Sequence, residues 1–199
     1  MINFENIETS EPYIKFQELY NQALKVNQEE IQAISISSLN KQTNEVESRF
    51  VNLKYIINNE WIFFSNYESV KASNFKEHDQ ISALFFWAKI NVQIRIKATI
   101  KKTDSHFSDL HYSNRSIKKN ALAVSSMQSR VIDSYETVKD NYKKALMENK
   151  TLQNRPKYWG GYSFYPYYFE FWNGHKSRLN KRECFHLNDG AWIPFMIQP

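Results

Sequence analysis

Aromatic and cationic side chains lie next to one another in the most distinctive stretch of the sequence, residues 155–182. This stretch contains ten aromatic residues, and three cations close it: Arg178, Lys181 and Arg182. A buried strand explains the aromatic residues but leaves the cations unexplained. A site for a flat anionic ligand explains both, because rings stack on flat molecules and arginine pairs with phosphate or carboxylate.

A phosphate on such a ligand would have to be held by side chains. The sequence has only four glycines and contains neither a G-x-G-x-x-G loop nor a Walker loop, so a glycine-rich backbone cradle cannot form. Arginine suits the role because its planar fork can take two phosphate oxygens, although a single Lys or Arg is more often a solvated surface charge. The candidates are Arg49, Lys54, Lys71, Arg115, Lys118, Lys119, Arg178 and Arg182.

Two local patterns add to these charges. Ser65 and Asn66 end an expected strand, and Lys71 lies in the first turn of the helix that follows. A hydroxyl, a helix N-terminus and a lysine together can form an anion pocket. Gln93 interrupts an alternating strand with an amide that could hydrogen-bond the edge of a heteroaromatic ring. The pattern alone slightly favours an ordinary exposed glutamine at this position.

The sequence offers little for nucleophilic or metal chemistry. It contains no G-x-S-x-G motif, and its five histidines are dispersed. His106 and His111 do not have the spacing of three or four that places two ligands on one helix face. No metal site is predicted, and the lone Cys184 is interpreted as an ordinary strand thiol.

Composition limits the classes of protein that the chain can belong to. Its 199 residues suffice for one domain with a core, and 42% apolar and 24% charged residues are ordinary for a globular protein. The formal net charge of +5 suits an anionic partner, but its scattered charges predict no nucleic acid partner. We found no signal-peptide core and no membrane-length apolar run, so we expect a cytoplasmic protein with no membrane partner.

The elements that must position these residues are mostly strands. We expect a flexible N-terminus over 1–11 and a single domain over 12–199. Alternating or aromatic runs predict strands at 31–38, 48–57, 60–66, 80–87, 90–102, 162–172, 182–187 and 191–195. Helical spacing predicts helices at 12–25, 69–78, 104–116 and 129–149, and turns are predicted at 58–59, 173–174 and 189–190. Because the helices cluster instead of alternating with strands, the fold class is mainly β with appended helices (α+β), an antiparallel barrel or sandwich.

Several sequence blocks resemble one known family. They are "SRFVNLK", "FFSNYESVKA", "ALFFW.....Q", "MQSR", "YWGGY", "EFWNG" and "SRLNKR", and the similarity runs over 12–199. Together they resemble the pyridoxamine 5′-phosphate oxidase family. The resemblance implies an FMN-binding split β-barrel that forms a homodimer with FMN at the subunit interface. It also implies an oxidase that converts pyridoxamine or pyridoxine 5′-phosphate to pyridoxal 5′-phosphate, with O2 giving H2O2.

The same resemblance implies roles for individual residues. The implied FMN-binding residues are Arg49, Phe50, Val51, Asn52, Leu53, Lys54, Phe64, Ser65, Lys71, Gln93, Gln128, Ser129, Trp172 and Arg182. The implied substrate-binding residues are Lys54, His111, Arg115, Lys119, Arg178 and Asn180, of which Arg178 and Asn180 are the implied catalytic pair.

The chain departs from the family pattern at four positions. Val70 replaces an arginine that contacts the FMN phosphate, His111 replaces a tyrosine and Lys119 replaces a serine. Asn180 replaces the histidine of an R-x-H motif and cannot carry a proton or positive charge. Because three of the four changes fall on the substrate side, two alternatives stay open. One is a related flavin oxidase or reductase for another substrate, such as a phenazine-type compound, and the other is a non-catalytic FMN-binding protein.

Overall fold

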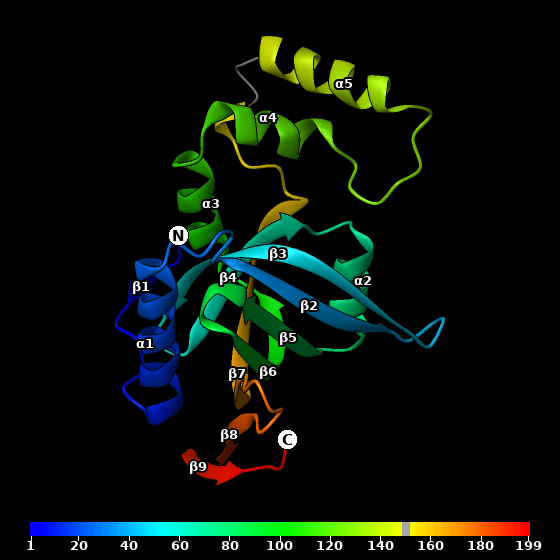
Figure 1. Cartoon of the computed structure of the whole chain (residues 1–199). Helices are drawn as coiled ribbons and strands as arrows, with labels where there is room; N and C mark the ends of the chain where they lie inside the picture. The colour runs from blue at the N-terminus through cyan, green and yellow to red at the C-terminus, as the bar shows by residue number, and fades with distance from the viewer. Residues whose placement is uncertain (149–151) are drawn as a thin grey trace.

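The computed structural model describes residues 1–148 and 152–199, and in this part of the chain nine strands form one sheet. The order along the sheet is β1-β3-β2-β5-β6-β7-β8-β9, and β4 pairs with both β3 and β7. This double pairing closes β2 to β7 into a ring (Figure 1). All pairs are antiparallel except β1 with β3, which confirms the predicted mainly-β class with appended helices.

The elements have the following bounds. The strands are β1 Asn3–Glu5, β2 Ala33–Asn40, β3 Glu45–Ile57, β4 Glu60–Asn66, β5 Gln80–Trp87, β6 Val92–Lys102, β7 Trp159–Asn173, β8 Lys181–Asn188 and β9 Ala191–Met196. The helices are α1 Glu11–Lys25, α2 Val70–Glu77, α3 Ser105–Ser113, α4 Ile117–Ser125 and α5 Tyr135–Met147, with a 3-10 turn, η1, at Ala88–Ile90.

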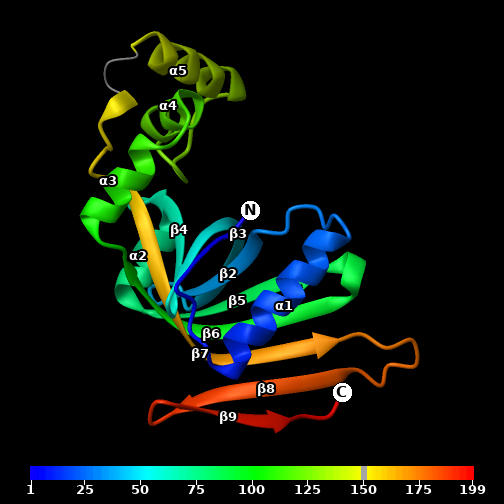
Figure 2. The ribbon, with the colours of Figure 1, turned by 90° about the vertical axis from the view of Figure 1, so that its left-hand side faces the viewer.

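The long strand β7 connects two separate ends of the molecule. Figure 2 shows α3, α4 and α5 together where β7 begins, and β8 and β9 alongside the other end of β7. Gly160 and Gly161 near its start allow close packing, since a Cβ at Gly160 would stand 2.2 Å from the Tyr67 hydroxyl oxygen. The strand therefore carries the aromatic stretch of the sequence from one end to the other.

The core is an aromatic cluster between α1 and the ring. Phe16 of α1 is fully buried, and its ring centroid lies 4.5 Å from that of Trp61 on β4. Tyr13, one helical turn earlier, packs edge-on against Phe169 of β7 at 5.4 Å. Edge-to-face pairs of this kind each add about 0.5–1.5 kcal/mol beyond burial of area. They fix α1 to the barrel without any contribution from a ligand.

Most predicted elements are confirmed within a few residues, and the turns follow the expected chemistry. Asn58, between β3 and β4, has φ +53, while Asp189 and Gly190 have φ +47 and φ +80 between β8 and β9. Positive φ is the conformation that tight hairpins require and that Asn, Asp and Gly tolerate. The predicted turn at 173–174 is longer, because β8 begins only at Lys181.

The structure differs from the sequence expectations in three places. Residues 1–11 are not simply a flexible end, because β1 pairs in parallel with β3 and the Ile2 amide donates to the buried Tyr20 hydroxyl. Helix α4 was not predicted at all. Helix α5 begins at Tyr135 instead of 129, and its predicted end at 149 lies outside the described residues. The single domain over 12–199 stays a proposal.

The described residues contain neither a helix that could cross a membrane nor a cluster that could hold a metal ion. No helix in them is long and apolar enough to cross a membrane. No group of three or more His, Cys, Asp or Glu side chains in the same residues is arranged to hold a metal ion.

Candidate active site

A cavity of about 550 Å³ lies between the β3–β4 part of the ring and the segment from α3 to the loop after α4. Twelve of the residues assigned from the sequence line it, among them cations, aromatic rings and a hydroxyl. Its lining is Arg49, Phe50, Val51, Asn52, Lys54, Phe64, Ser65, Lys71, His111, Asn114, Arg115, Ser116, Lys119, Gln128 and Trp159.

A β-bulge in β3 aims Lys54 into this cavity. The pairing with β4 steps from Leu53–Phe63 to Tyr55–Ile62, so Lys54 is one extra residue on β3. Leu53 and Ile56 are both fully buried, whereas Lys54 and Tyr55 between them are only partly buried. The extra residue thus turns two successive side chains away from the core, a use of bulges that is common near active sites. It also leaves the Leu53 side chain in the core, away from the cavity.

One group of cations in the cavity consists of Arg49 and Lys71. Lys71 is 6% exposed, and its ammonium donates to Ser69 Oγ at 2.9 Å. Burial, and then the nearby Arg49 charge, lowers the pKa of Lys71 to about 8. Arg49 donates to Ser38 Oγ at 2.7 Å and pairs with Glu47 at 2.8 Å. These contacts hold two positive charges near the N-terminus of α2, where an anion is favoured.

A second group of cations consists of Lys54, Arg115 and Lys119. Burial, followed by the charges of Lys119 and Arg115, lowers the pKa of Lys54. Arg115 lies over the Trp159 ring with its guanidinium carbon 4.2 Å from the centroid. Its NH2 donates to the Lys119 carbonyl at 3.3 Å, whereas its buried NH1 has no hydrogen-bond partner in the described structure. An unpaired buried guanidinium nitrogen is costly, so this end of the cavity is suited to an anion that would pair with it.

His111 lies nearly parallel to two rings that line this part of the cavity, Phe64 and Trp159. Its ring stacks on Phe64 with centroids 3.6 Å apart and an angle of 7° between the planes. Its Nδ1 lies 2.9 Å from the Tyr55 hydroxyl. Burial, together with Arg115, Lys54 and Lys119, lowers the pKa of His111 to about 4. The imidazole is therefore neutral near pH 7.

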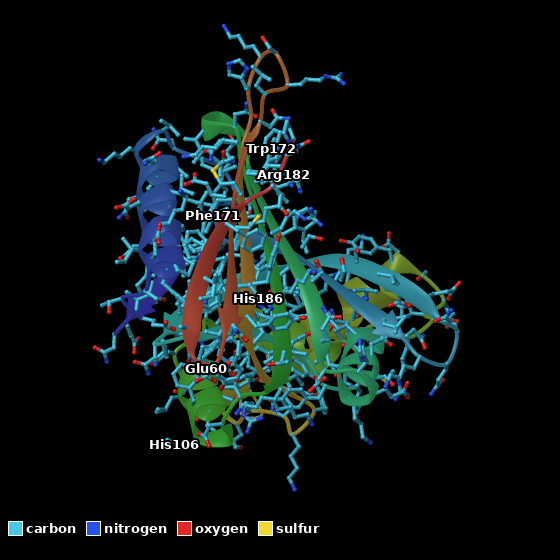
Figure 3. All side chains as sticks on the ribbon, turned by 90° about the horizontal axis from the view of Figure 1, so that it is seen from below. Glu60, His106, Phe171, Trp172, Arg182 and His186 are labelled. Carbon is cyan, nitrogen blue, oxygen red and sulfur yellow. The ribbon has the colours of Figure 1, made fainter. Side chains whose placement is uncertain are left out.

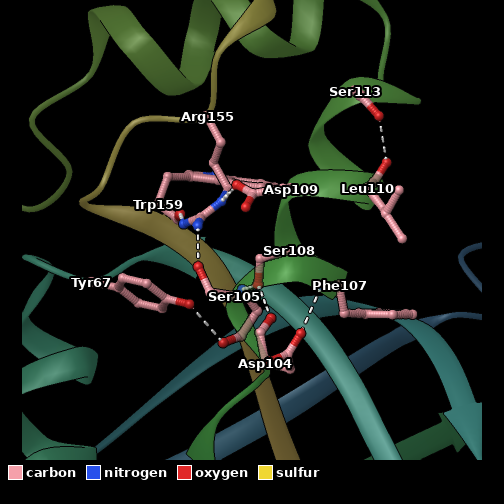
Figure 4. A network of polar contacts seen from close by, with 11 residues as sticks. Tyr67, Asp104, Ser105, Phe107, Ser108, Asp109, Leu110, Ser113, Arg155 and Trp159 are labelled. Carbon is pink, nitrogen blue, oxygen red and sulfur yellow. Dashed lines mark hydrogen bonds and ion pairs between the residues drawn. The ribbon is translucent and has the colours of Figure 1, made fainter.

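A polar network fixes α3, and with it His111, to the start of β7 (Figure 4). Arg155 donates to Asp109 at 2.6 Å, to Ser105 Oγ at 2.8 Å and to the Trp159 carbonyl at 2.6 Å. The Gly161 amide donates to Ser108 Oγ at 3.1 Å. Since Arg155 is the hub, one side chain ties the loop before β7 to the helix that carries His111.

Gln128 and Ser129 lie in the loop after α4, on the Lys71 side. Ser65 Oγ donates to Gln128 Oε1 at 3.3 Å, which links β4 to this loop. Ser129 has φ +72 and lines an adjoining cavity of about 480 Å³ together with Arg49, Val70 and Lys71. Val70 is 41% exposed and brings no polar group to this region.

Three of the assigned residues form a row elsewhere on the sheet. Gln93 of β6 pairs with Trp172 of β7, and Trp172 pairs with Arg182 of β8. Figure 3 shows Trp172 and Arg182 beside each other on these strands. Arg182 is held by Glu170, whose side chain is only 2% exposed. The Glu170 carboxylate accepts a hydrogen bond from Arg182 Nε at 2.8 Å and also pairs with Arg95 at 3.1 Å. None of the row lines the cavity.

The two predicted catalytic residues also lie outside the cavity. Arg178 is exposed and has φ +60 in the loop between β7 and β8. Asn180 Oδ1 accepts the His175 amide at 3.0 Å, an intraloop contact. Trp159 and Trp172 stand at opposite ends of the 15-residue strand β7, on the order of 40 Å apart along a strand. Within one chain, therefore, the assigned residues form two distant groups.

The structure adds cavity residues that the sequence did not single out. Trp159, Asn114 and Ser116 line the cavity, and Tyr55 supports His111 from behind it. Trp159 lies in the "YWGGY" block, so that block was the available signal. Tyr55 had no comparable signal, because only the bulge places it on this face.

Comparisons with known proteins identify the family of this chain. A family model described as the pyridoxine 5′-phosphate oxidase C-terminal dimerisation region matches residues 159–199. A pyridoxine/pyridoxamine 5′-phosphate oxidase of Synechocystis sp. is 31% identical and covers 94% of this chain and 88% of its own length. The protein of that name from Cytophaga hutchinsonii is 35% identical, with coverage of 94% and 88%.

Solved structures show the same fold. PhzG from Burkholderia lata, in complex with tetrahydrophenazine-1-carboxylic acid, matches with a TM-score of 0.89 at 23% identity, covering 96% of this chain and 93% of that chain. A pyridoxamine 5′-phosphate oxidase-related, FMN binding protein from Nostoc punctiforme has a TM-score of 0.78 at 11% identity, covering 96% and 99%. These likenesses confirm the split-barrel fold, and the relatives above 30% identity over nearly the full length show that this chain belongs to the pyridoxine/pyridoxamine 5′-phosphate oxidase family.

Proposed function

We propose that the protein is an FMN-dependent oxidase that converts pyridoxamine or pyridoxine 5′-phosphate to pyridoxal 5′-phosphate, reducing O2 to H2O2. The observation that carries this proposal is the presence of two separate cation groups in one cavity, Arg49 with Lys71 and Lys54 with Arg115 and Lys119. Two phosphorylated molecules, a cofactor and a substrate, need two such groups. Family membership supports the same conclusion.

The residues around Lys71 suit the phosphate and ring of FMN. Lys71 and Arg49 supply charge, and the Ser65–Gln128 pair supplies hydrogen-bonding groups beside them. When bound, FMN supplies the two-electron acceptor that takes hydride from the substrate and passes the electrons to O2. Val70 stands where the family has an arginine, so the FMN phosphate lacks one charge-assisted contact. Such a contact is worth about 1.5–3 kcal/mol when nothing replaces it.

The residues around Arg115 suit the phosphate of the substrate. Arg115 NH1 is buried without a partner, and Lys54 and Lys119 contribute two further charges. The flat neighbours Phe64 and His111 leave little room for a bulky group next to the anion. These side chains would fix the phosphate and orient the pyridine ring, so that the chain contributes placement and exclusion of water. No nucleophilic side chain is needed for hydride transfer.

A homodimer would bring the two distant groups of residues together. The family model that matches residues 159–199 is described as a dimerisation region, which supports a homodimer. We propose that Gln93, Trp172 and Arg182 of a second copy complete the FMN site. We also propose that Arg178 and Asn180 of that copy reach the substrate. Their place in an exposed loop, outside the cavity of their own chain, is what this arrangement requires.

A related flavin enzyme with another substrate is the second candidate. It is favoured by the amide of Asn180, which cannot act as a charged or proton-carrying group, and by His111, which is neutral near pH 7. Both departures lie on the substrate side, so they would change the substrate without changing the cofactor. The cytoplasmic location and the absence of a nucleic acid partner stay predictions. The non-catalytic alternative also stays open.

The two candidates are separated by a substrate screen of the purified, flavin-loaded protein. We expect a yellow dimer that releases H2O2 with pyridoxamine 5′-phosphate or pyridoxine 5′-phosphate and not with reduced phenazine carboxylic acids. H2O2 release with the phenazine compounds alone would assign the second candidate. A yellow protein that turns over none of these compounds would contradict the proposed oxidase activity.

A further inference from the structure

Tyr55 packs behind the residues that line the cavity and does not line it itself. The bulge at Lys54 turns Tyr55 out of the core, where its ring packs edge-on against Phe107 at 5.2 Å and Phe64 at 6.2 Å. It is not among the residues that line the cavity, whereas His111, next to it, is. Its hydrogen bond to the site therefore passes through His111, while its packing also reaches Phe64.

The His111 ring is held on one face and at one edge. Phe64 covers the face at 3.6 Å, and the Tyr55 hydroxyl lies 2.9 Å from Nδ1. Over residues 1–148 and 152–199 no hydrogen bond is made by Nε2. Because Nδ1 is engaged by Tyr55, Nε2 is the nitrogen left for a ligand in the cavity.

Protonation limits how Tyr55 and His111 can share a hydrogen. Arg115, Lys54 and Lys119 are the charged groups that act on His111, and with burial they lower its pKa to about 4. Burial, and then Glu5, raises the pKa of Tyr55, so the phenol keeps its proton. A neutral imidazole carries one N–H. When the Tyr55 O–H donates to Nδ1, that N–H is at Nε2; when Nδ1–H donates to the phenol oxygen, Nε2 presents a lone pair.

The surroundings of His111 decide between these two forms once an anion is bound. Three cations at this end of the cavity, one with an unpaired buried nitrogen, recruit an anionic group to the same place. A lone pair at Nε2 would repel that anion, whereas an Nε2–H would donate to it. The form in which Tyr55 donates is therefore the one that the ligand selects.

We propose that Tyr55 is a positioning residue: by donating to Nδ1 it stabilises the Nε2–H form of His111 that a bound anion selects, so that His111 acts as a neutral hydrogen-bond donor to the phosphate of the substrate. This inference rests on the proposed function, because it assigns the phosphate of that substrate to the Arg115 end of the cavity. It also explains how a histidine serves at a position where the family has a phosphate-binding tyrosine.

The test uses the flavin-loaded protein and Tyr55→Phe, which keeps the ring and removes only the hydroxyl. Binding of pyridoxal 5′-phosphate, followed by the change in flavin absorbance, does not require turnover. We expect Tyr55→Phe to weaken this binding about three- to tenfold, the range for loss of one hydrogen bond. FMN content and kcat should stay at the wild-type level while KM rises. Binding of pyridoxal, which lacks the phosphate, should not change.

A double-mutant cycle with His111→Phe separates positioning from packing. His111→Phe keeps a flat ring against Phe64 and removes both ring nitrogens. If Tyr55 acts through His111, adding Tyr55→Phe to His111→Phe should produce less than about a twofold further loss. Losses that simply multiply would overturn the proposal, because they would show that Tyr55 acts independently of His111.

Three other results would overturn it as well. One is a Tyr55→Phe variant with wild-type affinity for pyridoxal 5′-phosphate. Another is equal weakening of pyridoxal and pyridoxal 5′-phosphate binding, which would show a general packing effect. The third is a wild-type protein whose flavin absorbance does not respond to pyridoxal 5′-phosphate. By contrast, a protein that binds the phosphate in the predicted way but releases no H2O2 would contradict the proposed oxidase activity and leave the role of Tyr55 intact.

Discussion

At the scale of single residues, the cavity is defined by cations whose pKa burial lowers. Lys71 is the clearest case, since it is 6% exposed and its pKa is lowered to about 8. Surface lysines keep their charge well above this pH. The charge on Lys71 should therefore depend on pH within a range that is easily measured.

We expect the affinity of the apoprotein for FMN to fall as the pH rises above about 8. Below this pH Lys71 is charged in the free protein, and above it a proton must first be taken up before the phosphate is paired. The affinity can be measured by quenching of flavin fluorescence at pH 7 and at higher pH. A Lys71→Arg variant is the control, because arginine stays charged and its affinity should be nearly flat. A wild-type affinity that does not change with pH would contradict the role of Lys71.

Glu170 is expected to hold Arg182 in place for FMN. The Glu170 carboxylate is buried and accepts from both Arg182 and Arg95. Glu170→Gln should weaken FMN binding and lower the free energy of unfolding by about 2 kcal/mol, since it removes hydrogen bonds to a charged group. Arg95→Gln is the matched control, because the Arg95 side chain is 49% exposed and lies on the other side of the carboxylate. Equal loss of FMN from both variants would contradict the specific role of Arg182. It would show that FMN binding depends on the whole network of Glu170, Arg95 and Arg182.

At this scale the sequence predicted most of the cavity residues but missed Tyr55. Lys54, Ser65 and Lys71 were assigned from matched blocks and Arg115 from its matched position, and all of them line the cavity. Tyr55 was missed because alternation along a regular strand would place it in the core. A bulge changes that alternation and leaves no mark in the pattern of apolar residues.

At the scale of elements, hydrophobic alternation predicted the strands well because the ring has one buried face. On β6, residues Val92, Ile94 and Ile96 are buried and Arg95 and Lys97 are exposed, as a period of two requires. The helical segment 117–147 was predicted less well. Its helices α4 and α5 pack mainly on each other around a small cluster with Ala121 and Ala145, so the apolar stripe is weak.

The contact between α1 and the ring should provide much of the stability of the fold. Phe16→Ala removes a fully buried ring that packs on Trp61, Phe85 and Trp87, and we expect a loss of about 3–5 kcal/mol. Urea unfolding followed by far-UV circular dichroism measures it. Ile14→Ala, on the same helix but with its side chain 45% exposed, should cost far less. Similar losses for the two variants would contradict the position given to α1.

At the scale of the whole molecule, β7 separates the two groups of assigned residues, and we propose that a second copy brings them together. The family resemblance indicated all of these residues, but composition and periodicity could not show which chain supplies each one. Only the register of β6, β7 and β8, with Gln93 and Arg182 both next to Trp172, shows the second group as one row.

Mixing two inactive variants tests this division directly. Arg182→Ala should remove the β8 member of the row formed by Gln93, Trp172 and Arg182, and Lys71→Ala should remove a cation from the cavity. Each homodimer of a single variant therefore has two defective sites. After refolding of an equimolar mixture, mixed dimers should contain one site with both defects and one site with neither. We expect FMN binding and peroxide release to return in part. No recovery in a mixture that forms mixed dimers would place both residues in the same chain's site.

Reduction of the bound flavin by substrate, in the absence of O2, tests the central claim most directly. Pyridoxamine 5′-phosphate added anaerobically to the yellow protein should bleach the flavin absorbance, and admitting O2 should restore it with release of H2O2 and pyridoxal 5′-phosphate. A flavin that stays oxidised in the presence of both pyridoxamine and pyridoxine 5′-phosphate would contradict the claim that this protein is a B6-phosphate oxidase.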